Sequence, residues 1–281
     1  MANGSSSSSL AAPGHGGVRG WARRGRGWLA EASDAIVSVF FPAGCRICDA
    51  LLTSASRVPF CAECLLSFER VPNIVCEICG RPLPGWAPEP EQPRFCQACH
   101  NKTYAFDRAR SFAVYEKALV RAILLLKFEQ IKPLGAWFAE RLAEIVSAEG
   151  DALAADVVVP VPLHRERERE RGYNQAALFS KPLAKRLRLP HKAVLLMRTR
   201  ARPDKQVLSL EERWESVRGA FATRPGSQVD NLRVLLVDDV LTTGATLDAC
   251  ARALRDAGAK SVMGLTVARA VRNPLPSTGE W

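Results

Sequence analysis

Two adjacent carboxylates, Asp238 and Asp239, stand at the end of an apolar run in the last third of the 281-residue chain. The run, residues 234–237, has the composition of a buried strand. A short loop with Gly244 follows the acids, and a helical pattern covers residues 246–257. A strand that leads through such a loop to a helix N-terminus directs unpaired backbone N–H groups and the positive end of the helix dipole at the loop. The pattern therefore predicts an anion-binding site.

The side chains of this loop support the same prediction. Thr242, Thr243 and Thr246 carry hydroxyl groups that can donate to an anion, and Gly244 lets the backbone approach a ligand closely. The two carboxylates would repel a phosphate, so they need another partner, for which sugar hydroxyls or a phosphate-bound Mg²⁺ are the candidates. An ordinary strand–loop–helix turn with a capping threonine is the alternative, but it would require acids, threonines and glycine to coincide in order.

This stretch resembles the phosphoribosyl-pyrophosphate (PRPP) binding motif of type I phosphoribosyltransferases, in which an apolar strand, two acids and Thr-Thr-Gly-x-Thr follow one another. The resemblance implies that Asp238 and Asp239 are the catalytic acids and hold the ribose 2′- and 3′-hydroxyls. It also implies Mg²⁺, bound with PRPP. The 5′-phosphate would be bound by the residues of the loop, which are Thr242, Thr243, Gly244, Ala245 and Thr246.

Eight of the nine cysteines form four Cys-x-x-Cys pairs. Twelve residues separate the first pair from the second, and sixteen separate the third from the fourth. Each pair can place two thiolates on one side of a turn, and two pairs complete a tetrahedral shell of four sulfurs for Zn²⁺. We therefore predict two structural zinc ions in consecutive ribbons, with the ligands Cys45, Cys48, Cys61, Cys64, Cys76, Cys79, Cys96 and Cys99.

Alternatives to this arrangement stay open. An iron–sulfur cluster also accepts four thiolates, disulfides form in oxidising compartments, and the pairs can combine in a crossed order. His100 is surplus to a filled shell and is interpreted as a surface residue. Cys250 shares a helix face with Leu247 and Leu254, so it is interpreted as a buried apolar side chain and not as a nucleophile.

The net charge of +10 is concentrated in residues 163–202, which hold nine Arg and three Lys against three Glu. A positive field of this kind suits a polyanionic ligand such as PRPP, a nucleotide or nucleic acid. The alternating run at 165–171 also fits an ordinary solvated surface, so charge alone does not choose among these ligands.

The N-terminal segment has a different character. Residues 1–27 are rich in Ser, Gly and Arg, which predicts disorder. The apolar segment that follows carries Glu31 and Asp34, so it is a poor signal peptide. Residues 42–45 resemble a lipoprotein cleavage box, but Cys45 already belongs to the first cysteine pair. No apolar run reaches the roughly 20 residues that cross a bilayer, and we expect a cytoplasmic protein without a membrane span.

Strands and helices are predicted to alternate after the cysteines, which is typical of an α/β fold with ligands at the carboxyl ends of the strands. Hydrophobic spacing predicts strands at 109–115, 157–162, 233–238 and 261–268, and helices at 28–41, 117–128, 134–147, 175–187, 209–218 and 246–257. We expect a disordered tail at 1–27, a helix and double zinc ribbon at 28–100, a phosphoribosyltransferase-like domain at 101–272 and a flexible tail at 273–281.

From about residue 41 to residue 269, the chain resembles the ComF family of competence-associated phosphoribosyltransferase-like proteins. The resemblance rests on motifs that occur in order: the cysteine ribbons, Leu-Lys-Phe at 126–128, Val-Pro-Val-Pro at 159–162, Arg-Gly-Tyr-Asn-Gln at 171–175, Arg-Gly-Ala-Phe at 218–221 and the aspartate motif. It implies a type I phosphoribosyltransferase fold, Rossmann-like with a mainly parallel sheet, behind an N-terminal four-cysteine zinc-ribbon module.

The resemblance also implies where pyrophosphate would bind. The loop after Val161 lies where type I enzymes bind pyrophosphate. The basic segment 198–206 lies where these enzymes carry a mobile loop that closes over PRPP. The chain departs from the family pattern at 202–206 and at Ser216, and capping of a helix is an alternative role for Asn174. The candidate pyrophosphate contacts are Arg165, Arg167, Arg171, Arg198, Arg200 and Lys205.

Two functions follow as expectations. The first is transfer of a phosphoribosyl group from Mg²⁺–PRPP to a nitrogenous base or amine, with release of pyrophosphate. The second is a non-catalytic accessory protein of DNA uptake, which binds PRPP, a nucleotide or single-stranded DNA. The zinc ribbons and the basic segment fit the second function, which predicts DNA binding with a steep salt dependence.

Overall fold

A computed structural model of the chain describes residues 44–52, 58–85, 93–101, 104–129, 131–201 and 209–271. The helix predicted at 28–41, both predicted tails and Lys205 lie outside the described residues. None of the described helices is both long enough and apolar enough to cross a membrane.

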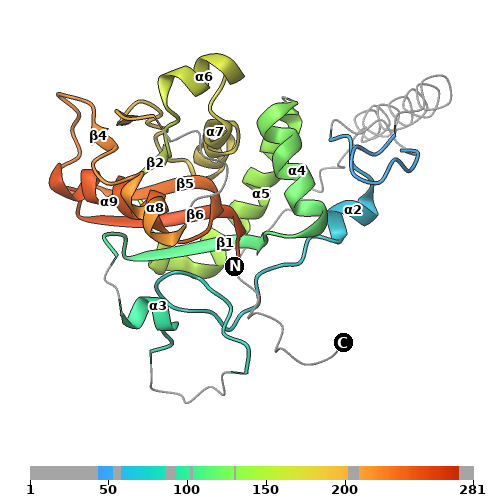
Figure 1. The fold of residues 1–281 in the computed structure, drawn as a ribbon, viewed down its shortest axis with the longest axis horizontal. Coiled ribbons are helices and arrows are strands. Elements are labelled where there is room, and N and C mark those ends of the chain that lie inside the picture. The colour runs from blue at the N-terminus through green and yellow to red at the C-terminus, as the bar shows by residue number, and fades with distance from the viewer. Residues whose placement is uncertain are drawn as a thin grey trace, which may run out of the picture.

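A four-stranded parallel sheet forms the centre of the described structure, with the strand order β1-β6-β5-β2 (Figure 1). Successive residues of the inner strands point to opposite faces, so Leu235 and Leu236 belong to different hydrophobic clusters. Both faces are covered, and the strands are therefore nearly continuous apolar runs. Their bounds are β1 (Arg108–Val114), β2 (Val157–Pro160), β5 (Arg233–Leu241) and β6 (Ser261–Arg269).

Helices cover both faces of this sheet. One face packs against α4 (Lys117–Phe128), α5 (Lys132–Glu149) and α7 (Gln175–Leu187). The other face packs against α9 (Ala245–Asp256) and the antiparallel pair of β3 (Leu196–Arg198) and β4 (Phe221–Thr223). The three-layer α/β architecture expected from the sequence is confirmed.

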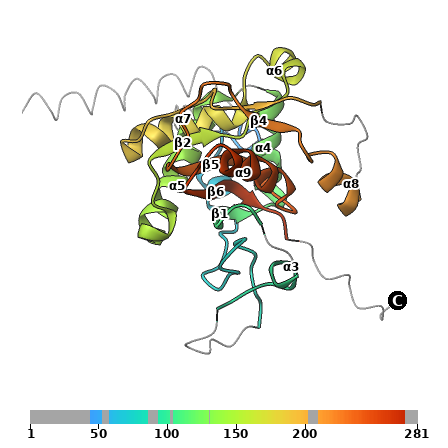
Figure 2. The same ribbon diagram turned by 90° about the vertical axis from the view of Figure 1, so that its left-hand side faces the viewer.

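The remaining elements lie at the periphery. Beyond the edge strand β1 lies α3 (Gln97–His100), and beyond the opposite edge lies α6 (Arg165–Arg171), as Figure 2 shows. The short helix α2 (Ala62–Leu66) lies near α4 (Figure 1). The other short elements are a 3₁₀ helix, η1 (Gly150–Leu153), and α8 (Leu210–Glu215).

Some elements differ from the sequence expectations. The alternating run at 165–171 has no buried residue, as a solvated surface requires, but it forms a helix that was not predicted. The β3–β4 pair was not predicted either. Strand β5 continues to Leu241 because its residues keep pairing with β6 beyond the predicted end at 238. Helix α8 covers less than the predicted 209–218, and a capping box between Ser209 and Glu212 fixes its start.

Candidate functional site

The two aspartates border a cavity of about 310 Å³ near the carboxyl ends of β2 and β5, which we call the aspartate cavity. Asp239 is 6% exposed and Asp238 is partly exposed. The threonine loop, residues 242–244, then leads from β5 to α9. The aspartate cavity brings together most of the predicted site residues, and its wall includes Asp238, Asp239, Thr242, Thr243, Ala245 and Thr246.

Gly244 is the N-cap of α9 and has a φ of 86°, a conformation that favours glycine. A Cβ added there would lie 2.9 Å from a ring carbon of Tyr104, so space also requires glycine. The helix begins at Ala245, one residue before the predicted start. Because Ala245 and Thr246 line the aspartate cavity, the first turn of α9, with its unpaired N–H groups, lies at the cavity wall.

The two carboxylates have different surroundings. Burial and the neighbouring charge of Asp239 raise the pKa of Asp238 to about 7, although the Asp239 backbone N–H donates to Asp238 Oδ1 at 2.8 Å. Asp239 Oδ2 accepts from Lys127 Nζ at 2.9 Å and from Gln175 Nε2 at 3.0 Å. One acid is therefore paired with a cation, whereas the other changes its charge near neutral pH.

Among the predicted pyrophosphate contacts, Arg167, Arg171 and Arg198 line the aspartate cavity. Arg171 donates to Gln175 Oε1 at 3.0 Å, and its guanidinium lies 5.0 Å from the ring centre of Phe128. These contacts hold the guanidinium group beside the start of α7. Three of the predicted cations thus face the same cavity as the aspartates.

Two other predicted contacts lie elsewhere. Arg165 lines a smaller neighbouring cavity of about 180 Å³, and Arg200 donates to the backbone carbonyl of Arg218. Neither lines the aspartate cavity. Arg165 belongs to the same helix, α6, as Arg167 and Arg171, but its side chain points to the neighbouring cavity, and Arg200 lies two residues after the end of β3.

Asn174 acts as a helix cap. Its Oδ1 accepts from the Ala176 N–H at 3.0 Å, and its Nδ2 donates to the carbonyl of Val161 at 2.9 Å. The capping alternative is therefore confirmed. The bond to Val161 also fixes the start of α7, from which Gln175 reaches Asp239.

Sequence reasoning missed several residues that complete the cavity wall. Lys127 comes from the last turn of α4, and Arg213 comes from α8. The motif at 126–128 was a signal for Lys127, but nothing in the local sequence connects it to Asp239. Arg213 and Tyr115 had no signal of their own.

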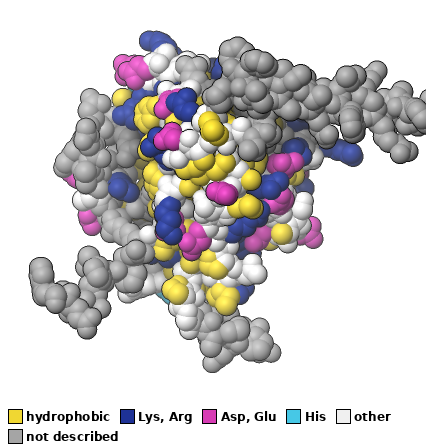
Figure 3. All heavy atoms as spheres, turned by 90° about the vertical axis from the view of Figure 1, so that its right-hand side faces the viewer, with side chains coloured by type: hydrophobic (Ala, Val, Ile, Leu, Met, Phe, Trp, Pro, Cys, Tyr) yellow, Lys and Arg dark blue, Asp and Glu magenta, His cyan; other side chains and the backbone are white. Residues whose placement is uncertain are grey.

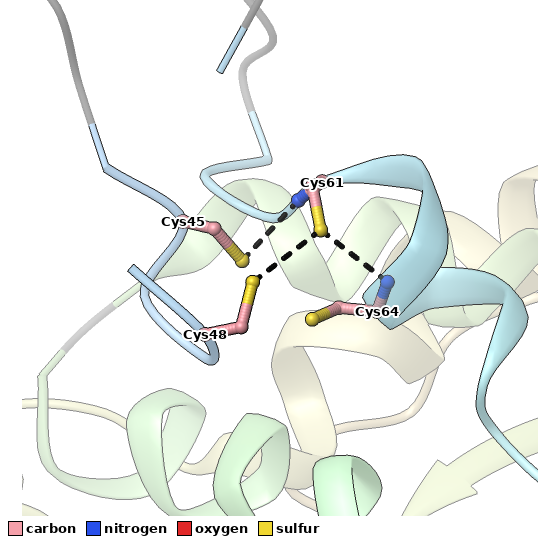
Figure 4. A group of neighbouring side chains, drawn as sticks. All are labelled: Cys45, Cys48, Cys61 and Cys64. Atoms are coloured by element: carbon pink, nitrogen blue, oxygen red, sulfur yellow. Dashed lines mark hydrogen bonds between the residues drawn. The ribbon is translucent and has the colours of Figure 1, made fainter. Parts of the chain in front are cut away.

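The eight paired cysteines form two clusters, in each of which the four sulfur atoms lie within 4.8 Å of one another. Cluster 1 is formed by the first and second pairs (Figure 4), and cluster 2 by the third and fourth, as predicted. A Zn–S distance of about 2.3 Å in a tetrahedron requires sulfur atoms about 3.8 Å apart. The measured Cys48–Cys61 and Cys79–Cys96 separations of 3.7 and 3.6 Å fit this shell.

Cluster 2 is connected directly to the threonine loop. Arg269, at the end of β6, is 2% exposed. One of its terminal nitrogens donates to the Leu241 and Thr242 carbonyls at 2.8 and 2.6 Å, and the other lies 3.6 Å from Cys79 Sγ. The Tyr104 hydroxyl donates to the Thr243 carbonyl at 3.2 Å. Side chains next to cluster 2 therefore fix the backbone of the loop.

The chain was compared with known families and proteins. Residues 174–277, which include the threonine loop, match the family described as "Phosphoribosyl transferase domain". The chain is similar to Competence protein F of Haemophilus influenzae, with 28% identity over 82% of this chain and 99% of the relative. It is 30% identical to the DNA utilization protein YhgH of Salmonella typhimurium, over 79% of this chain and 94% of the relative. Competence protein ComFC of Bacillus subtilis is 28% identical over 74% and 83%.

The chain belongs to the ComF family. The segment that matches the phosphoribosyltransferase domain contains Asn174, the two aspartates, the threonine loop and Arg269. The parallel sheet and the two cysteine clusters complete the ComF architecture that the motifs indicated. Several lining residues of the aspartate cavity come from before the matched segment, among them Lys127 of α4 and the α6 residues Arg167 and Arg171.

Proposed function

We propose that the protein binds Mg²⁺–PRPP in the aspartate cavity and transfers its phosphoribosyl group to a nitrogen acceptor, with release of pyrophosphate. The observation that carries this proposal is the meeting of two aspartates, the threonine loop and the first turn of α9 on one cavity wall. The 5′-phosphate would bind to the loop and the helix N-terminus. Asp238 and Asp239 would hold the ribose hydroxyls.

The positive charges on the wall of the aspartate cavity also support the binding of PRPP. Arg167, Arg171, Arg198 and Arg213 share the cavity wall with the aspartates. Such cations favour a polyphosphate ligand, and they would stabilise the charge that develops on pyrophosphate as its bond to C1′ breaks. Mg²⁺ bound to the diphosphate would neutralise part of the same charge. Positioning and electrostatics are thus the main contributions of the protein.

The names of the relatives suggest a setting for this chemistry. Competence protein F and the DNA utilization protein YhgH are named for the uptake or use of DNA. A role in handling DNA or its nucleotides is therefore part of the proposal for this chain. We also propose that each cysteine cluster binds one structural Zn²⁺, because four sulfurs close the shell and leave no position for water.

Calorimetric titration of PRPP into the zinc-loaded full chain, with and without Mg²⁺, tests the proposal. We expect saturable binding that requires Mg²⁺ and is lost in the double variant Asp238→Asn/Asp239→Asn. The variant Glu63→Gln is a matched control, because Glu63 is exposed on α2 and lies outside the aspartate cavity. Equal PRPP affinity in the double variant and the control would contradict the proposal.

A further inference from the structure

A second and larger cavity, of about 850 Å³, adjoins the aspartate cavity, and we call it the aromatic cavity. Four residues line both cavities: Tyr115, Arg213, Thr242 and Thr243. The other walls of the aromatic cavity come from cluster 2, from α8 and from the end of β6. A ligand on the threonine loop would therefore have the aromatic cavity as its direct neighbour.

Aromatic rings form much of this second wall. Tyr104, Tyr115 and Trp214 all line the aromatic cavity. Tyr104 is held in place because its ring stacks on Phe106 at a centroid distance of 4.7 Å and its hydroxyl bonds to the threonine loop. The Trp214 ring lies 6.0 Å from the Tyr104 ring at an angle of 42°, so the two rings are neighbours that do not stack on each other. Such faces bind flat unsaturated rings by stacking.

The polar groups of the aromatic cavity include both hydrogen-bond donors and acceptors. Arg81 and Arg213 supply guanidinium donors, whereas Glu211 and Glu215 supply carboxylate acceptors. A heterocycle with ring nitrogens and exocyclic polar groups has complementary acceptors and donors along its edge. Ammonia is about the size of water, which occupies roughly 30 Å³, and would leave a cavity of about 850 Å³ almost empty.

We propose that the aromatic cavity binds the acceptor of the phosphoribosyl group, and that this acceptor is a free aromatic nitrogen heterocycle of the nucleobase class. The inference rests on the proposed function and narrows it, because an aliphatic amine or ammonia would need no aromatic wall. A ring nitrogen donates its electron pair to C1′ as the bond from C1′ to pyrophosphate breaks. Pyrophosphate leaves with the electrons of that bond, and the proton of the ring nitrogen passes to water.

Product analogues test this inference without turnover. Ribose 5-phosphate fills only the phosphate and ribose positions, whereas AMP, GMP, CMP and UMP add a base that extends toward the aromatic cavity. Calorimetry on the zinc-loaded full chain would compare the five compounds. Stacking of one base on an aromatic side chain predicts that at least one nucleotide binds about tenfold or more tightly than ribose 5-phosphate.

The variant Trp214→Ala tests whether the additional affinity of the nucleotide arises in the aromatic cavity. Trp214 lines the aromatic cavity but not the aspartate cavity. Most of the gain of the nucleotide over ribose 5-phosphate should therefore be lost, while ribose 5-phosphate itself binds as before. Trp214→Phe retains a ring and should keep most of the gain. The unchanged affinity for ribose 5-phosphate also shows that each variant is folded.

The outcomes separate this inference from the proposed function. Failure of ribose 5-phosphate and PRPP to bind would overturn the proposed function itself. Binding of ribose 5-phosphate with no further gain for any nucleotide would overturn only the acceptor inference. A further outcome is that an oligonucleotide without a terminal phosphate, such as dT10, binds to the wild type and not to Trp214→Ala. The aromatic cavity would then be a surface for single-stranded DNA and not an acceptor site.

Discussion

Clusters 1 and 2 have the same set of four cysteine sulfurs, but they are attached to different parts of the molecule. Cluster 1 lies beside the helices. In its segment, Phe68 packs edge-on against Trp137 of α5 at 5.6 Å and is stacked with Phe138. Arg46 pairs with Glu129 just after α4, and Figure 3 shows that acidic and basic side chains lie close together on this side of the molecule.

Cluster 2 instead lies against the edge strand β1 of the sheet. The Ala109 N–H donates to the Ile78 carbonyl at 2.6 Å, and Gly80 approaches the Ala109 carbonyl so closely that an added Cβ would lie 2.7 Å from it. Arg269 then connects Cys79 to the threonine loop. The comparison indicates that two identical sets of four cysteines have different surroundings: cluster 1 packs beside the helices of the core, and cluster 2 contacts residues that hold the threonine loop.

Removal of cluster 2 should have the largest effect on the site. In the double variant Cys79→Ser/Cys96→Ser, we expect bound zinc to fall from two ions to one per chain, and PRPP affinity to fall at least tenfold. The reason is that Arg269 and Tyr104 hold the threonine loop from this side. Metal analysis and calorimetry measure the two effects. Loss of one zinc with PRPP affinity unchanged within twofold would show that cluster 2 does not support the site.

The matched variant for cluster 1 is Cys48→Ser/Cys61→Ser. We expect the same loss of one zinc, and a decrease in the free energy of unfolding of more than about 2 kcal/mol, because metal binding is coupled to folding. PRPP affinity should stay within twofold, since none of these cysteines lines the aspartate or aromatic cavity. Denaturant unfolding and calorimetry test this. A tenfold loss of PRPP affinity here would show that both clusters act on the site.

Arg269→Met breaks the connection between cluster 2 and the loop while keeping all eight cysteines. Loss of the buried guanidinium removes the side-chain donor of the Thr242 carbonyl and one of two donors to the Leu241 carbonyl, which keeps the Ala270 N–H, and should lower the free energy of unfolding by about 3 kcal/mol. PRPP affinity should also fall. Arg218→Met is the control, because the Arg218 side chain is 77% exposed. Similar urea midpoints for the two variants would contradict the role of Arg269.

Asp238→Asn leaves both clusters intact and changes only the charge in the aspartate cavity. The raised pKa of about 7 means that folding favours protonated Asp238, so its contribution to stability is present below about pH 4 and is lost as the pH rises through 7. The stability of the variant relative to the wild type should therefore increase by about 2 kcal/mol between pH 5.5 and pH 8 without ligand. Urea unfolding at both pH values tests this, and a constant difference would show that Asp238 is ionised throughout.

Tyr104→Phe should have the smallest effect. The ring and its packing against Gly244 stay, and only the bond to the Thr243 carbonyl is lost. Such a bond contributes about 1 kcal/mol, so PRPP affinity should fall about fivefold while zinc content stays at two ions. Calorimetry and metal analysis measure both quantities. If affinity does not change, the Tyr104 hydroxyl does not contribute to the geometry of the loop.

Much of the fold was predictable because its signals are local. The helices at 117–128 and 175–187 were predicted with their observed bounds, since their apolar spacing and the cap at Asn174 mark them clearly. The β3–β4 pair was missed for the opposite reason. Three-residue strands show little periodicity, and Leu196 pairs with Thr223 only after the intervening chain has folded back.

The residues of the site also fall into those that the local sequence predicts and those that it does not. Its acids, threonines and glycine are contiguous, so the sequence alone brought them together. Lys127 reaches Asp239 from a helix far away in the sequence, and Arg213 comes from α8, so only tertiary packing places them. Arg165 and Arg200 do not line the aspartate cavity, because charge in a segment does not determine which way a side chain points. The aromatic cavity had no sequence signal for the same reason.

The last strand of the sheet in the sequence, β6, lies inside the sheet, between β1 and β5. All eight clustered cysteines lie before residue 100, so the nascent chain contains both complete clusters before the strands of the sheet have been made. Arg269 ends the last of these strands. Because its side chain holds the threonine loop, the loop acquires its final geometry only after β6 has inserted. The cysteines of both clusters are therefore synthesised before the strand that completes the threonine loop.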